Sequence, residues 1–244
     1  MPINNELRIQ KYLSSQGIIS RRGAEQAVTR GRVEINGKKA ATGQKVIPEI
    51  DEITLDGVII AQKTEDKKIY VMLNKPAGVV TTMSDEKKRI CVTDILDKTA
   101  IKERIYPVGR LDMYSEGLLL LTNDGETANK LAHPKNEIGK TYVVSIKGEP
   151  NQNLIKKFSE PLLIGGKKTS PAKTEVIKQK NGVTKLKVEI SEGKNRQIRR
   201  ICDNLGLVVL KLKRVCVGKL HLGGLAPGRW RYLSRSEINY LKEL

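Results

Sequence analysis

The sequence predicts a chain of short helices and strands divided into two units, a small one followed by a larger one rich in strands. Three observations support this prediction. Residues 4–62 alternate amphipathic stretches with glycine-containing turns, residues 62–68 contain no apolar side chain, and residues 118–121 are four consecutive leucines. A polar segment of this kind is typical of a linker, and a short apolar run is typical of a buried strand. The 244 residues suffice for one large or two modest domains, each with its own core.

The first unit is expected to combine two short helices with a few short strands. Residues 7–13 have an amphipathic pattern that ends near Gly17, and Ser20 is placed to cap a second helix that stops around Gly31. Strand-forming residues then flank Asn36-Gly37, a pair typical of a hairpin turn. A further strand and turn are expected at 53–57.

The second unit is predicted from strand and helix patterns of its own. The four leucines predict a buried strand, and Asn123-Asp124-Gly125 after them predicts a tight turn. The other expected elements are, in order, a strand at 70–80 interrupted by a Lys-Pro-x-Gly turn, helices at 92–96 and 127–133, a strand at 140–146, a helix at 150–158, a hairpin turn at 163–169, strands at 173–179 and 183–190, a helix ending at Gly206 and a strand at 210–215.

The charge of the chain favours a polyanionic partner. It carries 45 Lys and Arg against 27 Asp and Glu, a formal net charge of +18, and each phosphate that such side chains neutralise releases counterions. No apolar run approaches the ~20 residues that span a bilayer, and residues 1–10 are too polar for a signal peptide. We therefore expect a cytoplasmic protein that does not bind membranes.

Two kinds of bound group are disfavoured. The cysteines (Cys91, Cys202 and Cys216) are odd in number and far apart, which suits neither a disulfide framework nor a zinc site. Residues 163–169 (LIGGKKT) match the phosphate-loop motif only in part, because Pro161 stands where that motif requires a glycine. We expect neither a metal site nor a nucleotide cofactor.

One carboxylate, Asp112, lies just before the leucine strand, in the sequence GRLDMYSEG at 109–117. An isolated loop aspartate usually shapes a turn or caps a helix. However, GRLDxxSxGLLLLTNDG resembles the central motif of pseudouridine synthases, specifically the bacterial ribosomal-RNA enzymes of the RsuA/RluB type. The aspartate of GRLD is catalytic in that family, so the resemblance implies a catalytic role for Asp112.

The resemblance extends over essentially the whole chain. Further motifs of the family match at 73–81 (LNKPAGVVT), 140–144 (KTYVV), 192–201 (EGKNRQIRRI), 210–215 (LKLKRV) and 223–234 (GGLAPGRWRYLS). The first unit, with two short helices followed by GRVEINGK, resembles an S4 RNA-binding domain. The resemblance implies an α+β protein in which a small S4 domain at 1–62 precedes a synthase domain at 67–244 with a large mixed, mainly antiparallel sheet.

The same resemblance implies the reaction, in which a uridine in RNA loses its C1′–N1 bond, the uracil turns, and C5 joins C1′. No electron or group is exchanged, so no cofactor is expected. Asp112 acts as nucleophile or as base, a choice that the sequence leaves open, and Arg199 is the cation expected to keep it ionised. Tyr142 is expected to stack on the uracil and is a candidate to take the C5 proton. Leu212 is expected to cover the other face of the base, and Arg110 to fill the space that the flipped base leaves.

Other basic side chains are candidates for phosphate contacts, which position a protein on RNA without reading its sequence. They cluster on the helix pair and hairpin of the first unit and at 187–219, where nine basic residues accompany three acidic ones. A solvated helix face is the alternative interpretation. The RNA-binding candidates are Arg8, Arg21, Arg22, Arg32, Lys38, Lys194, Arg196 and Arg200.

The expected substrate is ribosomal RNA. TNDGETANKLAHP at 122–134 is closest to the RluB-like branch, which favours 23S (large-subunit) RNA, free or in an assembling subunit, as the substrate of a monomeric enzyme. A small-subunit (16S) target is the alternative.

Two other classes stay open. A hydrolase of glycosidic bonds needs a second carboxylate, such as Glu116 or Asp124. A non-catalytic S4-type RNA-binding assembly factor would leave Asp112 and Arg199 without a task.

Overall fold

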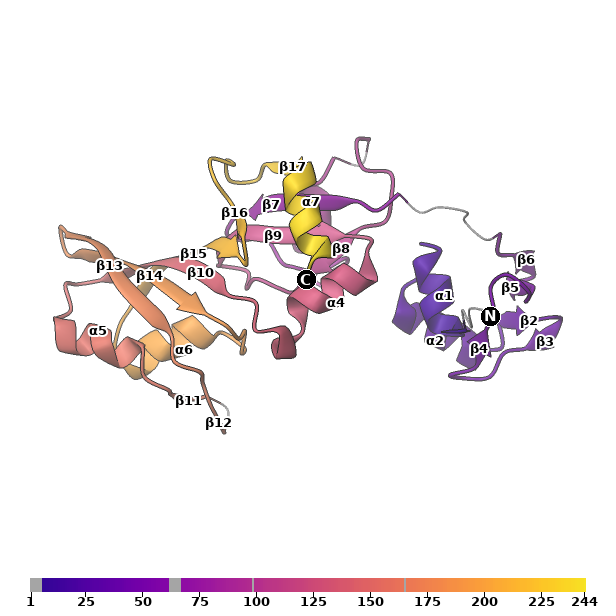
Figure 1. Ribbon diagram of the computed structural model, residues 1–244, viewed down its shortest axis with the longest axis horizontal. Helices are drawn as coiled ribbons and strands as arrows, with labels where there is room; N and C mark the ends of the chain where they lie inside the picture. Colours follow the sequence, from indigo (N-terminus) through magenta and orange to yellow (C-terminus); the bar gives the residue numbers. More distant parts are fainter. Residues whose placement is uncertain (1–5, 62–66, 98, 165) are drawn as a thin grey trace. The chain divides into compact units, whose positions relative to one another are not determined.

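The computed structural model describes residues 6–61, 67–97, 99–164 and 166–244. It divides into two compact units, Met1–Lys68 and Ile69–Leu244, each with its own hydrophobic core. Most of the polar linker predicted at 62–68 falls on residues 62–66, which lie outside the described residues. Figure 1 follows the chain from the first unit, in indigo and violet, into the second.

The first unit combines two helices with short antiparallel strands. The helices are α1 (Ile9–Ser15) and α2 (Arg21–Thr29). One sheet has the order β3 (Lys38–Lys39), β2 (Val33–Ile35), β5 (Ile53–Leu55) and β6 (Val58–Ile59), and a separate ladder pairs β1 (Leu7–Arg8) with β4 (Lys45–Val46). Apolar residues of both helices and of the strands form one core: Ile9, Tyr12, Leu13, Ala24, Ala27, Val28, Val33, Ile35, Ala40, Val46 and Ile53.

Local signals in the sequence account for these elements. The Ser20 hydroxyl accepts a hydrogen bond from the Gly23 amide at 3.0 Å, which caps α2 as predicted. Asn36 (φ 51°) and Gly37 (φ 74°) are both left-handed. This is the backbone that a two-residue hairpin turn requires, and it joins β2 to β3.

The second unit is built on a nine-stranded sheet. Its main path runs β13-β14-β10-β15-β9-β7-β17, with β16 beside β15 and β8 beside β9. Among the ladders described for this sheet, the one between β15 and β9 is parallel, through two residue pairs, and the others are antiparallel. The predicted mixed, mainly antiparallel sheet is therefore confirmed. The strands are β7 (Tyr70–Lys75), β8 (Tyr106–Val108), β9 (Glu116–Thr122), β10 (Lys140–Lys147), β13 (Lys173–Lys180), β14 (Val183–Ile190), β15 (Val209–Val217), β16 (Leu220–His221) and β17 (Trp230–Tyr232).

The central strands β7 and β9 are buried on both faces. Side chains alternate along a strand, so Val71, Leu73, Leu119 and Leu121 join one core while Tyr70, Met72, Leu118 and Leu120 join a second. This explains why the four leucines form an uninterrupted apolar run rather than an alternating pattern. The first strand of the unit, β7, pairs with the last one, β17, with Leu73 opposite Trp230.

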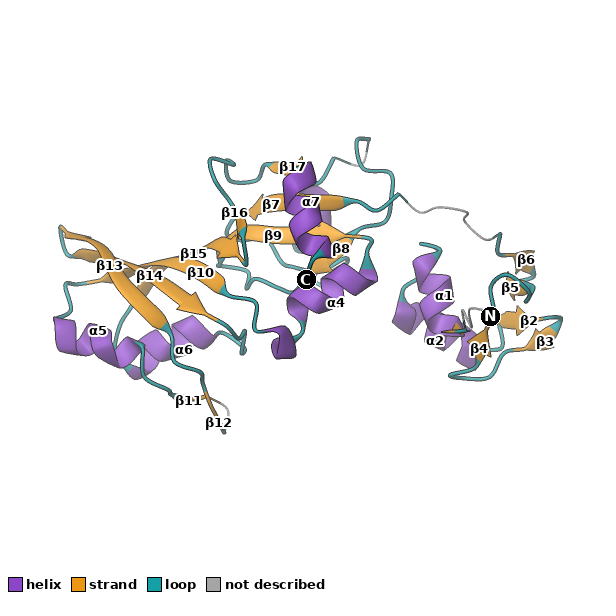
Figure 2. Cartoon of the chain, viewed as in Figure 1, coloured by secondary structure: helices purple, strands orange, loops and turns teal. Residues whose placement is uncertain are grey.

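Helices cover both faces of this sheet (Figure 2). Those that supply buried residues to the first of the two cores are α3 (Val92–Ile95), α5 (Gln152–Phe158) and α6 (Gln197–Asn204). Those that pack against the other are α4 (Gly125–Ala132) and α7 (Arg235–Lys242). A 3-10 turn at Pro134–Asn136 follows α4, and β11 (Leu163–Ile164) and β12 (Lys167–Lys168) form a separate hairpin. None of the described helices has the length and apolar composition that a membrane crossing requires.

One predicted turn is wrong. Asn123-Asp124-Gly125 was expected to form a tight turn after the leucine strand, but it begins α4. The Asp124 carboxylate accepts hydrogen bonds from the amides of Glu126 and Thr127 at 3.1 and 3.3 Å, which makes it the N-cap of that helix. The hairpin signal failed because an aspartate before a glycine suits a helix start as well as a turn.

Candidate active site

Asp112 lies in the loop between β8 and β9 and lines a pocket of about 640 Å³. Loop 108–112, strand β10, the segment 190–198 and strand β15 contribute the other walls. The pocket brings together five of the residues that the sequence singled out: Arg110, Tyr142, Lys194, Arg196 and Leu212. Arg199 and Arg200 are not among the residues that line it.

The loop that carries Asp112 is held by a lysine that sequence reasoning missed. Lys75, the last residue of β7, is fully buried. Its Nζ donates to the carbonyl oxygens of Pro76, Met113 and Ser115 at 2.9, 3.1 and 2.8 Å, so all three of its N–H donors are used. Two of these carbonyls, those of Met113 and Ser115, belong to the turn that follows Asp112. The buried ammonium group of Lys75 therefore holds this turn in place.

Burial also changes the acidity of this lysine. Loss of hydration lowers the pKa of Lys75 to about 8, against the opposing effect of the Glu116 and Asp112 charges. The sequence contains a signal for this residue, because Lys75 lies in the apolar strand expected from residue 70. A lysine in such a strand is seldom buried without a specific partner.

The cation nearest the Asp112 carboxylate is Arg196 rather than Arg199. Arg196 Nη1 lies 3.9 Å from Asp112 Oδ2, and both side chains are partly exposed. Arg199 Nη2 instead donates to the Tyr114 carbonyl at 3.0 Å, and its Nε is buried without a hydrogen-bond partner among the described residues. The cation beside Asp112 in this structure thus comes from three residues before Arg199, and the Arg199 side chain donates to the backbone of the same loop.

This difference has a local cause. Arg196 is the N-cap of α6 and has a left-handed backbone, with φ 51° and ψ 31°. The sequence predicts where this helix ends, at Gly206, but not how it begins. The left-handed residue turns the chain before the helix begins, which changes the direction of the side chain at 196.

The residues expected to hold the base lie on adjacent strands. Tyr142 on β10 is opposite Arg214 of β15, and Val144 is opposite Leu212. Tyr142 and Leu212 are both buried and both line the pocket, whereas Arg110 is exposed at its edge. Ser115 also lines it, and its hydroxyl is buried without a hydrogen-bond partner among the described residues.

A glycine sets the spacing of the two strands beside the pocket. A Cβ on Gly117 of β9 would lie 2.1 Å from the carbonyl oxygen of Arg214 on β15, and its φ of 104° also disfavours any other residue. The parallel contact of β9 with β15 is limited to this region, Lys213 opposite Glu116 and Arg214 opposite Gly117. Only glycine permits the approach that places the Asp112 loop beside β15.

The carboxylates considered for a hydrolase have structural partners instead. Glu116 pairs with Lys211 at 3.0 Å. Asp124 caps α4 and accepts from the Tyr70 and Thr127 hydroxyls at 2.7 and 2.6 Å. Neither lines the pocket with Asp112. Within the described ranges, no group of three or more His, Cys, Asp and Glu side chains forms a candidate metal site, and all three cysteines are buried and free.

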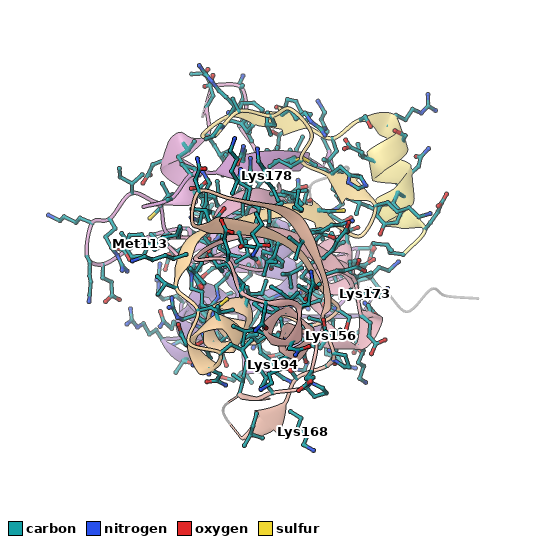
Figure 3. The ribbon with its side chains drawn as sticks, turned by 90° about the vertical axis from the view of Figure 1, so that its left-hand side faces the viewer. Met113, Lys156, Lys168, Lys173, Lys178 and Lys194 are labelled. Carbon is teal, nitrogen blue, oxygen red and sulfur yellow. The ribbon has the colours of Figure 1, made fainter. Side chains whose placement is uncertain are left out.

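The candidate RNA-binding residues are distributed over both units. In the first, Arg8, Arg21, Arg22 and Lys38 are exposed, whereas Arg32 forms a two-pronged ion pair with Asp56. In the second, Lys194 pairs with Glu192 at 2.9 Å, and Arg200 donates to Asn195 at 3.0 Å. Figure 3 shows Lys194 and further lysines from α5, β12 and β13 at one end of this unit, labelled Lys156, Lys168, Lys173 and Lys178.

Comparison with known proteins decides the family. Residues 69–204 match the family model described as RNA pseudouridylate synthase. The chain belongs to this family. Residues 7–49 match the S4 domain model, so the resemblance read from GRLD, KTY and the first unit is confirmed.

Relatives of the synthase match over its whole length. Ribosomal large subunit pseudouridine synthase B of Bacillus subtilis (strain 168) is 40% identical over 239 residues, which cover 97% of this chain and 96% of that relative. The dual-specificity RNA pseudouridine synthase RluF of Escherichia coli (strain K12) is 33% identical over 96% of this chain and 78% of its own. A crystal structure of a pseudouridylate synthase has a TM-score of 0.69 at 30% identity and covers 96% of this chain and 99% of its own. The synthase is an isomerase that acts on RNA.

Proposed function

We propose that this synthase converts a specific uridine of 23S ribosomal RNA to pseudouridine and that Asp112 is the catalytic carboxylate. The observation that carries the proposal is the placement of Asp112: it lines a large pocket, on a loop that a buried lysine clamps, with an arginine 3.9 Å away. Similarity to a relative named for the large subunit supports the choice of RNA.

The pocket supplies what an isomerisation of a nucleoside needs. The target nucleotide leaves its stack before it can enter, and the exposed Arg110 at the pocket edge is placed to fill the vacated space. The C1′–N1 bond then breaks, the uracil turns between Tyr142 and Leu212, and C5 bonds to C1′. The C5 proton leaves and N1 gains one, so product and substrate have the same composition.

Asp112 serves this reaction as an anion. It attacks the ribose as a nucleophile or removes a proton from it as a base. The Arg196 guanidinium lies 3.9 Å from the carboxylate and compensates part of its negative charge. Arg199 fixes the backbone of the next turn through the Tyr114 carbonyl.

The first unit, residues 1–62, serves RNA binding, and residues 67–244 serve catalysis. Arg8, Arg21, Arg22 and Lys38 are exposed and available for phosphate contacts. The residues that line the pocket all lie in the second unit, and a monomer is the proposed form of the enzyme. A substrate in ribosomal RNA or in an assembling large subunit is consistent with action in the cytoplasm.

The test maps pseudouridines across 23S and 16S RNA from cells with and without the gene. One position in 23S RNA should lose pseudouridine without the gene and regain it with the wild-type gene but not with Asp112→Asn. Asp203→Asn, an exposed aspartate on α6, is the matched control and should restore modification. Loss confined to 16S RNA would overturn the proposed target, and full restoration by Asp112→Asn would overturn the proposed carboxylate. Purified protein that retains 23S transcripts or large-subunit precursors without converting any uridine would support the assembly-factor interpretation instead.

A further inference from the structure

The pocket contains a buried arginine for which the described residues provide no counter-charge. Arg214 on β15 is only 5% exposed. Its Nε donates to the Leu118 carbonyl at 2.7 Å, and neither an ion pair nor a hydrogen bond to a carboxylate is formed by its guanidinium within the described part of the chain. Four of its five N–H donors therefore have no protein partner there.

A second cation lies close to the first. Lys140, at the start of β10, donates from Nζ to the Ile138 carbonyl at 2.7 Å. Burial lowers the pKa of Lys140, and the positive charge of Arg214 lowers it further. No carboxylate contributes to this shift, so the two cations repel each other without a compensating negative charge.

Both residues line the pocket that contains Asp112. Arg214 is opposite Tyr142 across the sheet, and Lys140 is two residues before Tyr142 on the same strand. The acidic residues that line the pocket are Asp112 and Glu192, and each already has a cation, Arg196 at 3.9 Å and Lys194 at 2.9 Å.

Lys75 shows that this protein can bury a cation without a ligand. Its three donors all reach carbonyl oxygens, whereas Arg214 uses one donor and leaves both Nη groups without an acceptor among the described residues. Neither Nη is one of the buried side-chain atoms that lack a partner, so both reach the open pocket, where an anion or polar ligand can bind them. Two Nη groups of one guanidinium match two oxygens of a phosphate in a bidentate contact.

We propose that Arg214 and Lys140 form a phosphate subsite that binds the phosphodiester group adjacent to the target uridine. This inference rests on the proposed function, because it places a nucleotide of RNA in the Asp112 pocket. The subsite holds the backbone of the flipped nucleotide from inside the pocket, next to the tyrosine expected to contact its base.

The experiment uses the full-length protein and a short RNA stem-loop that contains the mapped target uridine. In the phosphate on the 5′ or the 3′ side of that uridine, a methyl group replaces one non-bridging oxygen, which gives a neutral methylphosphonate. Binding and turnover are measured for wild type, Lys140→Gln, Arg214→Gln and Arg214→Lys. Lys185→Gln on β14 is the charge-matched control, because this lysine is exposed and does not line the pocket.

The expected signature is a lack of additivity. Each Gln variant should raise the Kd and the KM for RNA by about tenfold, the size of one lost charge-assisted hydrogen bond, and Arg214→Lys should recover part of the loss. Methylphosphonate at one of the two positions should weaken binding to wild type and to Lys185→Gln by a similar factor. It should have little further effect on Arg214→Gln or Lys140→Gln.

Several outcomes would overturn the subsite. If methylphosphonate weakened wild-type binding at neither position, the two cations would contact the base or the ribose instead. Strict additivity of methylphosphonate with both Gln variants would exclude a shared contact. The pair would be assigned to a free anion by two results together. Inorganic phosphate would inhibit more than chloride does at equal ionic strength, and methylphosphonate would have no effect. Lys140→Gln keeps the test decisive if Arg214→Gln fails to fold.

Binding is measured independently of turnover. A wild-type protein that binds this RNA but forms no pseudouridine would therefore contradict the proposed function and not the subsite.

Discussion

Arg196 reaches Asp112 from a left-handed backbone position: Nη1 and Oδ2 are 3.9 Å apart, and φ of Arg196 is 51°. A non-glycine residue in this conformation costs roughly 1 kcal/mol or more. The conformation ends the 190–196 segment and starts α6, so the same residue sets the direction of the helix and supplies the cation at the carboxylate.

Arg196→Asn should lower turnover modestly. Asparagine tolerates the left-handed backbone, so the start of α6 is kept while the charge is removed. An ion pair between partly exposed groups is worth up to about 1 kcal/mol, which is roughly a fivefold change in rate at neutral pH. Tritium release from 5-tritiated uridine in RNA measures this change in turnover.

Arg199→Leu should lower kcat in the same assay for a different reason. It removes the hydrogen bond to the Tyr114 carbonyl and loosens the turn after Asp112. If Arg199→Leu lowered kcat by several orders of magnitude and Arg196→Asn left it unchanged, the pairing expected from the sequence would describe the working enzyme better than the ion pair at Arg196.

Lys75→Met should lower kcat while the protein remains folded. Methionine fills the buried volume but leaves the carbonyls of Pro76, Met113 and Ser115 without their donor. The turn that follows Asp112 should loosen, and kcat should fall by about tenfold or more, since small misplacements of a catalytic group are costly. Circular dichroism and urea unfolding establish that the variant is folded. Wild-type kcat in a folded Lys75→Met protein would show that the clamp is dispensable.

The same variant should change how stability depends on pH. The pKa of Lys75 is about 8 in the folded protein and about 10.4 in an unfolded chain. Between these values the unfolded state binds more protons, so the wild-type free energy of unfolding should rise with pH from this group. Below pH 8 both states are protonated and the contribution is flat. The difference between wild type and Lys75→Met, measured by urea unfolding from pH 7 to 10, should show this rise; a constant difference would contradict it.

Gly117→Ala should destabilise the second unit strongly. The new Cβ would overlap the Arg214 carbonyl oxygen, 2.1 Å away, and would need a backbone that other residues avoid. A loss of about 3 kcal/mol or more is expected, in the range of severe backbone and packing defects. Gly182→Ala isolates the backbone part, because its φ is also positive but nothing lies within 4 Å of the added Cβ. That control should cost about 1 kcal/mol, and similar urea midpoints for the two variants would argue against the close approach.

Much of the architecture could be predicted because each signal is local. The serine cap of α2, the Asn36-Gly37 turn and the alternation along β10 and β14 depend on neighbouring residues, and their elements appear where expected. The leucine run predicted burial on both faces for the same reason.

Several features of the site could not be read in this way. Lys75 and Ser115 are 40 positions apart, and Arg199 and Tyr114 are 85 apart. Their contacts follow from strand order, which no local pattern encodes. The left-handed backbone at Arg196 likewise has no glycine or asparagine to signal it. The motif resemblance located the catalytic loop, but the partners of that loop came from the tertiary structure.

Removal of residues 1–62 should weaken RNA binding more than chemistry. The first unit has its own core, and the pocket residues all lie in the second. The truncated protein should bind long ribosomal RNA less tightly, with a shallower dependence on salt because fewer phosphates are contacted. Slow turnover should persist at high enzyme concentration. A truncated protein that is folded by circular dichroism yet wholly inactive would assign the first unit a direct part in the reaction.

Turnover should not require a metal ion. Both the isomerisation chemistry and the side chains lining the pocket allow the reaction to proceed with protein groups alone. Chelation of enzyme and RNA, under monovalent salt that keeps the RNA folded, should leave the rate within about twofold of the untreated rate. Recovery of a lost activity by one specific divalent ion, with RNA folding unchanged, would reveal a metal requirement.

The pairing of β7 with β17 has a consequence for synthesis of the protein. Residues of β7 at 71–73 find their edge partners only at 230–232, so the sheet stays open at that side until almost the whole chain has left the ribosome. The first unit depends on no residue beyond 60 for its core, and domains fold as units in the order in which they are translated. The smaller RNA-binding unit is therefore complete while the larger catalytic unit is still being made. The nascent enzyme must keep β7, a strand whose first four residues are apolar, from pairing with other chains throughout that interval.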